Sequence, residues 1–125
     1  MSKTALILFA HGARDPEWAS PVRRVQAAVL ARAPDLRVEL AFLEFMAPAL
    51  GECAESLLAE GFERIVVLPM FIARGGHLKS DVPRLLSALR LRHPQARFDL
   101  AEVIGEVDSV IEAMSGAALA ATRLP

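Results

Sequence analysis

Two histidines, His11 and His77, are the residues of this chain whose type and setting best suit metal binding or proton transfer. Each lies beside a glycine, which lets a ligand approach the backbone closely. Two neutral imidazoles suit late first-row divalent metals such as Co²⁺, Ni²⁺ and Fe²⁺, and they leave coordination positions open. A neutral imidazole also accepts a proton near pH 7, because its unperturbed pKa is about 6.5. The pair is therefore a candidate metal site.

Three charged residues are further candidates for the same site. Glu44 comes just after the second apolar run, where its carboxylate either assists a histidine or is simply solvated. Arg14 and Arg74 flank the histidines in sequence, and their planar guanidinium groups suit bidentate binding of substrate carboxylates. Apolar residues nearby offer a wall for a flat ring, although ordinary core packing accounts for at least half of them: Phe45, Met46, Met70, Phe71 and Ile72.

The elements that must position these residues alternate between strands and helices. Short apolar runs predict strands at 4–10, 38–43, 64–69 and 97–103. Helical periodicity predicts helices from Asp15 or Ser20 to about 33, at 48–60, from Ser80 or Asp81 to 93, and at 107–122. This order predicts an α/β fold, with a four-stranded parallel sheet covered by helices on both faces as a three-layer sandwich.

The predicted topology brings the two histidines toward one cleft. His11 directly follows the first strand, and His77 falls in the loop after the third, since Pro83 fits the first turn of the following helix. In open parallel sheets, ligands bind outside the carboxyl ends of the strands. The first and third strands are commonly neighbours in this architecture, so both imidazoles are expected at one edge of the sheet.

The length and composition of the chain indicate one domain, residues 1–125, without a membrane span. The net charge of −1 argues against non-specific nucleic-acid binding, and no apolar segment approaches the ~20 residues that span a bilayer. The single cysteine, Cys53, excludes an intrachain disulfide, and no signal peptide is recognisable, so a cytoplasmic location is expected. The 54% hydrophobic content suggests that some apolar surface serves a subunit interface.

Two stretches of the chain carry a resemblance to a known family. One is the apolar strand that runs into residues 11–16, HGARDP, and the other is residues 69–77, PMFIARGGH, followed by 81–83, DVP. With them, the sequence resembles the sirohydrochlorin cobaltochelatase family in its short form, called CbiX, along essentially the whole chain. The family usually has serine where this chain has Ala13, which removes a hydroxyl but neither candidate ligand.

The resemblance implies a chelatase-like α/β fold and a lyase that inserts Co²⁺ or Fe²⁺ into sirohydrochlorin, a tetrapyrrole, in cobalamin or sirohaem biosynthesis. It implies that His11 and His77 bind the metal, that His11 is also the catalytic proton acceptor, and that no organic cofactor takes part. The substrate-binding positions that it implies are Glu44, Ile72, Ala73, Arg74, Gly75 and Gly76. Larger relatives contain two such lobes with the cleft between them, so a homodimer is expected here.

Three questions stay open at the level of sequence. One imidazole cannot bind metal and accept a proton through the same nitrogen at once, so the steps are sequential or Glu44 or a water shares the work. A non-catalytic carrier of metal or tetrapyrrole would need the same histidines, whereas a histidine phosphatase would need arginine where this chain has Ala10. Imidazole ligands accept cobalt, iron and nickel alike, so the residues do not select the metal.

Overall fold

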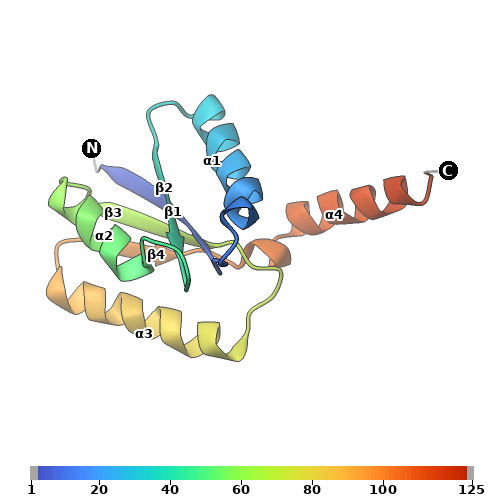
Figure 1. Ribbon diagram of the computed structural model, residues 1–125. Helices are drawn as coiled ribbons and strands as arrows, with labels where there is room; N and C mark the ends of the chain where they lie inside the picture. Colours follow the sequence, from blue (N-terminus) through green and yellow to red (C-terminus); the bar gives the residue numbers. More distant parts are fainter. Residues whose placement is uncertain (1–2, 124–125) are drawn as a thin grey trace.

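A four-stranded parallel sheet in the order β2-β1-β3-β4 forms the centre of the computed structural model (Figure 1). The structure describes residues 3–123, except for the side chains of residues 77–79. Its strands are β1 (Thr4–Ala10), β2 (Arg37–Phe42), β3 (Arg64–Pro69) and β4 (Arg97–Leu100). All three strand pairs are parallel, and β1 lies directly beside β3. The predicted α/β class and the predicted neighbourhood of the first and third strands are confirmed.

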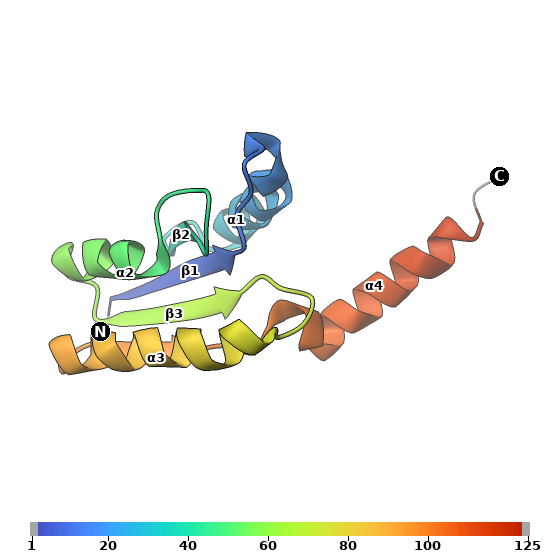
Figure 2. The same cartoon turned by 60° about the horizontal axis from the view of Figure 1, so that its bottom comes forward.

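Helices cover both faces of this sheet and give three layers. Helix α1 (Ser20–Arg32) lies on one face, and α2 (Leu50–Ala59) and α3 (Gly76–Arg92) lie on the other (Figures 1 and 2). Two short 3₁₀ helices, η1 (Pro16–Ala19) and η2 (Ile104–Glu106), precede α1 and the last helix, α4 (Asp108–Ala121). None of the helices in the described part of the chain is long and apolar enough to cross a membrane.

The main core lies between the sheet and the layer formed by α2 and α3. Successive side chains of a strand point to opposite faces, and Ile7, Ile65 and Val67 are fully buried on the face toward these helices. Leu57 of α2 and Leu86 of α3 meet them there, each no more than 1% exposed. A smaller buried cluster lies beside α1 and consists of Ala10, Ala19 and Phe42.

Both predicted starts of the first helix are used, one after the other. The Asp15 carboxylate caps η1 by accepting a hydrogen bond from the backbone N–H of Glu17 at 3.0 Å. Helix α1 then begins at Ser20, with Pro21 in its first positions, where the missing backbone donor costs little.

The predicted start of the third helix is wrong. Helix α3 begins at Gly76 and not at Ser80 or Asp81, and Pro83 therefore lies inside the helix. Proline removes one helical hydrogen bond, but the helix buries Val82 together with leucines further along, and this packing offsets the loss. His77 consequently belongs to the first turn of α3 and not to a loop.

The end of the chain differs from the expected pattern in two ways. Strand β4 stops at Leu100 and not at residue 103, because Val103 turns into the main core and η2 follows at once. The predicted last helix is confirmed as α4, yet it packs on neither face of the sheet and projects from the body (Figure 2). Its apolar residues Ile111 and Met114 are 47% and 38% exposed.

Candidate active site

His11 leaves the carboxyl end of β1 and is held by the backbone of the segment that follows β2. The N–H of Glu44 donates to the His11 carbonyl at 3.0 Å, one residue after Leu43 N–H donates to the Ala10 carbonyl at 2.9 Å. Gly12 comes next, with φ +88°. A Cβ atom there would overlap the Glu44 carbonyl oxygen, so this turn requires glycine and brings Glu44 beside His11.

The His11 ring packs against the loop that follows β3. Its edge-to-face contact with Phe71 has a centroid distance of 4.3 Å and an interplanar angle of 77°. Phe71 is 3% exposed and is fixed in turn by Phe9 at 5.7 Å. His11 itself is exposed, and in the described part of the chain its ring nitrogens have no hydrogen-bond or ion-pair partner. The imidazole is therefore oriented by an apolar contact, and no described polar group occupies its nitrogens.

The rim around His11 combines one free carboxylate with exposed apolar side chains. The Glu44 side chain is exposed and has no partner among the described residues. Phe45 has φ +65°, is 58% exposed, and stacks with the Arg14 guanidinium 5.0 Å from its ring centre. Ile72, on the β3 loop, is 72% exposed. Of the predicted apolar wall, only Phe45 and Ile72 are exposed, whereas the others pack partly or wholly in the core.

The loop after β3 is fastened to η2, which sequence reasoning did not anticipate. The N–H of Gly105 donates to the Phe71 carbonyl at 2.9 Å, and a Cβ atom on Gly105 would overlap the Ile72 carbonyl oxygen. Arg74 pairs with Glu106 at 3.4 Å. Residues more than 30 positions apart make these contacts, and no sequence pattern signals them. The segment that carries the predicted positions 72–76 therefore rests on η2, which directly precedes α4.

The structure brings the strand ends that carry His11 and the β3 loop together, but it does not test whether the two imidazoles meet. The backbone of His77 lies in the first turn of α3, and its side chain is outside the described residues. Among the described residues, no three or more His, Cys, Asp or Glu side chains are grouped as a metal site. The roles of His11, His77, Glu44 and the loop therefore remain predictions.

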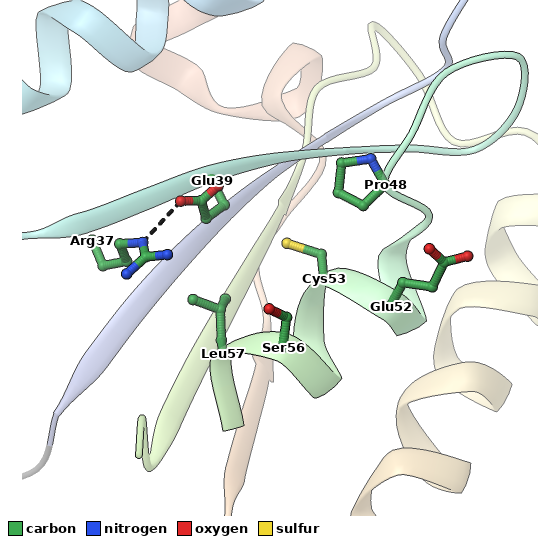
Figure 3. Close-up of a pocket in the computed structure, with 7 residues that line it drawn as sticks. All are labelled: Arg37, Glu39, Pro48, Glu52, Cys53, Ser56 and Leu57. Carbon is green, nitrogen blue, oxygen red and sulfur yellow. Dashed lines mark hydrogen bonds and ion pairs between the residues drawn. The ribbon is translucent and has the colours of Figure 1, made fainter. Parts of the chain in front are cut away.

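A separate pocket lies between β2 and α2, away from these residues (Figure 3). Two of its three charged residues pair with each other, since the Arg37 guanidinium lies 2.8 Å from the Glu39 carboxylate. Burial raises the pKa of the Cys53 thiol to about 11, so this thiol is protonated at neutral pH. The pocket offers neither a free imidazole nor a thiolate, and it does not compete with the carboxyl edge as a metal site.

A three-layer parallel α/β fold with an exposed histidine and a glycine-bearing loop at its carboxyl edge defines a small ligand-binding α/β domain. The sequence profile of the CbiX family matches residues 5–119, and the chain belongs to this family. It is 46% identical over 81 residues to a sirohydrochlorin cobaltochelatase of Saccharolobus islandicus, which is 65% of this chain and 62% of that protein. A sirohydrochlorin cobaltochelatase of Methanococcus aeolicus is 32% identical over 85 residues, 68% and 59% of the two chains. The match thus spans less than two thirds of these curated relatives.

Solved structures confirm the chelatase-like fold. A CbiX protein of cobalamin biosynthesis from Marinobacter aquaeolei superposes with a TM-score of 0.81 at 26% identity, over 95% of this chain and 97% of that one. SirB from Bacillus subtilis with Fe³⁺ gives a TM-score of 0.77 at 22% identity, over 98% of this chain but 48% of SirB. The present chain therefore corresponds in fold to about half of SirB.

Proposed function

We propose that this chain is a sirohydrochlorin chelatase, a lyase that inserts a divalent metal into the tetrapyrrole. The observation that carries the proposal is the His11 imidazole, which is exposed at the carboxyl edge, oriented by Phe71 and without a polar partner among the described residues. The names of the curated relatives support sirohydrochlorin as substrate and Co²⁺ as the first metal to test. Fe²⁺ and Ni²⁺ are the alternatives, because imidazole binds all three.

The chemistry requires that M²⁺ replaces two pyrrolic protons of the macrocycle. His11, with His77, holds the incoming metal, and after the metal passes to the ring the freed imidazole accepts a proton. Glu44 lies one backbone hydrogen bond away from His11, and its unpaired carboxylate takes the second proton, directly or through water. This order of steps removes the conflict between the two roles of one imidazole.

The rim suits the substrate, a flat ring bearing carboxylates. Phe45 and Ile72 present exposed apolar surface to the ring faces. Arg14 supplies a guanidinium for a peripheral carboxylate, and Arg74 supplies another when it leaves the exposed ion pair with Glu106. The glycines at 75 and 76 leave open space beside the loop, since a Cβ on either would meet nothing within 4 Å.

The proposal includes a homodimer in the cytoplasm. The chain corresponds to about half of SirB, so a second copy supplies the second lobe that would close a cleft over the carboxyl edge. Cys53 is a free, buried thiol, as expected in a reducing compartment.

A spectroscopic insertion assay tests the proposal. Sirohydrochlorin is offered with Co²⁺, Fe²⁺ or Ni²⁺ in turn, and turnover is compared for the wild type, His11→Ala and His77→Ala. We expect turnover with at least one metal and a loss of about 100-fold or more in each variant. Stoichiometric binding without turnover would establish the carrier function instead, and wild-type rates in both variants would refute the roles of the histidines.

A further inference from the structure

Gly105, in η2, makes a very close backbone contact with the loop that follows β3. A Cβ atom at position 105 would overlap three main-chain atoms of Ile72: the carbonyl oxygen, the carbonyl carbon and Cα. The N–H of Gly105 donates to the Phe71 carbonyl at 2.9 Å. Among the described glycines, only Gly12 comes as close to another backbone, at the Glu44 carbonyl. Only a residue without a side chain lets η2 lie this close to the start of the loop.

Phe71 carries this contact from η2 to the imidazole. The last hydrogen bond of the strand ladder before it is from Met70 N–H to the Phe9 carbonyl, at 2.7 Å. Beyond that point, the backbone hydrogen bond that holds Phe71 in the described structure comes from Gly105. The Phe71 ring is 3% exposed and meets the His11 ring at a centroid distance of 4.3 Å. One residue thus joins the backbone of η2 to the side chain of His11.

The orientation of the His11 ring depends on this contact more than is usual for a metal-binding histidine. Such a histidine commonly donates its second ring N–H to a carboxylate or a carbonyl, which fixes the ring. The described residues offer His11 no such partner, and the edge-to-face contact with Phe71 takes its place. A misplacement of about 1 Å in a reacting group can cost about 10²-fold in rate. The position of Phe71 is therefore important for the chemistry of His11.

We propose that Gly105 is a positioning residue of the chelatase site, which fixes the Phe71 ring and through it the orientation of the His11 imidazole. The inference rests on the proposed function and adds to it a residue that acts on His11 only through Phe71. A side chain at position 105 would push the Ile72 backbone away from η2, because main-chain atoms cannot rotate aside as a flexible side chain can. Phe71 directly precedes Ile72, so its backbone and its ring would shift against His11.

The NMR signals of the imidazole rings test the proposal without relying on turnover. The chain has three histidines, so ¹³C-labelled imidazole gives three sets of signals, and the His11→Ala variant assigns one of them. The ring current of Phe71 displaces the His11 signals, and Phe71→Leu removes that displacement while keeping an apolar side chain. We expect Gly105→Ala to move the His11 signals at least halfway to their Phe71→Leu position and to leave those of His93 in place. Unmoved His11 signals overturn the proposal.

A matched glycine variant separates positioning from a general loss of stability. Gly61→Ala strains the backbone at φ +97° before β3, at the other edge of the sheet, so it should leave the His11 signals unchanged. Titration with Co²⁺ alone should show about 10-fold weaker binding in Gly105→Ala than in Gly61→Ala. The losses from Gly105→Ala and Phe71→Leu should not add in the double variant, since both act through one ring contact. Full additivity, or equal Co²⁺ affinity in the two glycine variants, refutes the positioning role.

A second variant keeps the test decisive if Gly105→Ala does not fold. Replacing Gly105 by glycolic acid through semisynthesis turns its amide into an ester, which removes the N–H donor and adds no Cβ atom. This protein should move the His11 signals in the same direction as Gly105→Ala, and unmoved signals again overturn the proposal. Displaced His11 signals in a chain whose wild type inserts no metal refute the chelatase function alone. Normal insertion by Gly105→Ala with unmoved His11 signals refutes the positioning role alone.

Discussion

The two edges of the sheet differ in how far their charged and titratable side chains are paired. At the amino edge, where the strands begin, Arg37 pairs with Glu39 and Glu60, and Arg64 pairs with Asp99, all at 2.8–3.0 Å. At the carboxyl edge, neither the His11 ring nor the Glu44 carboxylate has a partner among the described residues. Charges that satisfy one another stabilise the fold modestly, whereas unpaired groups at the ligand-binding edge stay free for a substrate.

The contrast is clearest between two histidines. His93, at the end of α3, has its Nε2 atom 2.8 Å from the Glu55 carboxylate, which also pairs with Arg92. His11 instead makes an edge-to-face contact with the buried Phe71, and its ring nitrogens have no polar partner among the described residues. The same residue type thus serves the fold at one edge and is available for chemistry at the other.

The largest expected difference is between two single variants, in which one or the other of these histidines is replaced by alanine. His11→Ala should lower the rate of metal insertion by about 10²–10⁴-fold, and it should cost about 1 kcal/mol of unfolding free energy through the lost ring contact. His93→Ala should cost a similar amount of stability, because its ion pair is partly exposed. Its insertion rate should stay within about twofold of the wild type, since His93 lies far from the site. Equal losses of activity would break the comparison.

Two glycines with positive φ, one at each edge of the sheet, allow the edges to be compared through the backbone. Gly12→Ala would force a Cβ into the Glu44 carbonyl at φ +88°, and we expect a loss of about 3 kcal/mol or more together with impaired insertion. Gly61→Ala has φ +97° but open space around its Cβ, so only the conformational strain of about 1–2 kcal/mol remains. Urea unfolding of both variants gives the two values. A Gly12→Ala protein as stable as Gly61→Ala would show that the turn at Gly12 accommodates a Cβ atom at little cost.

The sequence predicted the fold better than it predicted the surroundings of the site. Short apolar runs placed the strands Thr4–Ala10 and Arg64–Pro69 at their observed bounds, because the apolar run of a buried strand is a local signal. The start of α3 was missed because Pro83 suggested a first turn, whereas the buried face of the helix outweighs the lost hydrogen bond. The tie between Gly105 and the β3 loop is a contact between distant segments, which no local pattern encodes.

The pH dependence of stability should also distinguish the two edges of the sheet, with a smaller effect. The hydrogen bond from Arg64, aided by Arg97, holds the pKa of Asp99 below its usual range. A carboxyl group with a lowered folded pKa stabilises the fold above its unfolded pKa of about 3.9, and this stabilisation is lost as the pH falls through the folded value. Asp99→Asn should therefore lower the urea midpoint at pH 7 but not at a pH below the pKa of Asp99 in the folded chain. Glu44→Gln, which removes an unpaired carboxylate, is the control and should leave the midpoint unchanged at pH 7.

Cys53 should give the smallest effect of all on activity. Its thiol has a pKa of about 11 in the folded chain because burial opposes the thiolate, whereas an unfolded cysteine ionises near 8.5. Folding thus holds the thiol protonated, and the associated stability is present below about pH 8.5 and declines as the pH rises toward the folded value. At pH 8 iodoacetamide should label the native protein far more slowly than the urea-unfolded chain, and Cys53→Ala should insert metal within about twofold of the wild-type rate. Rapid native labelling that stops insertion would mean that the β2–α2 pocket, and not only the carboxyl edge, contributes to the reaction.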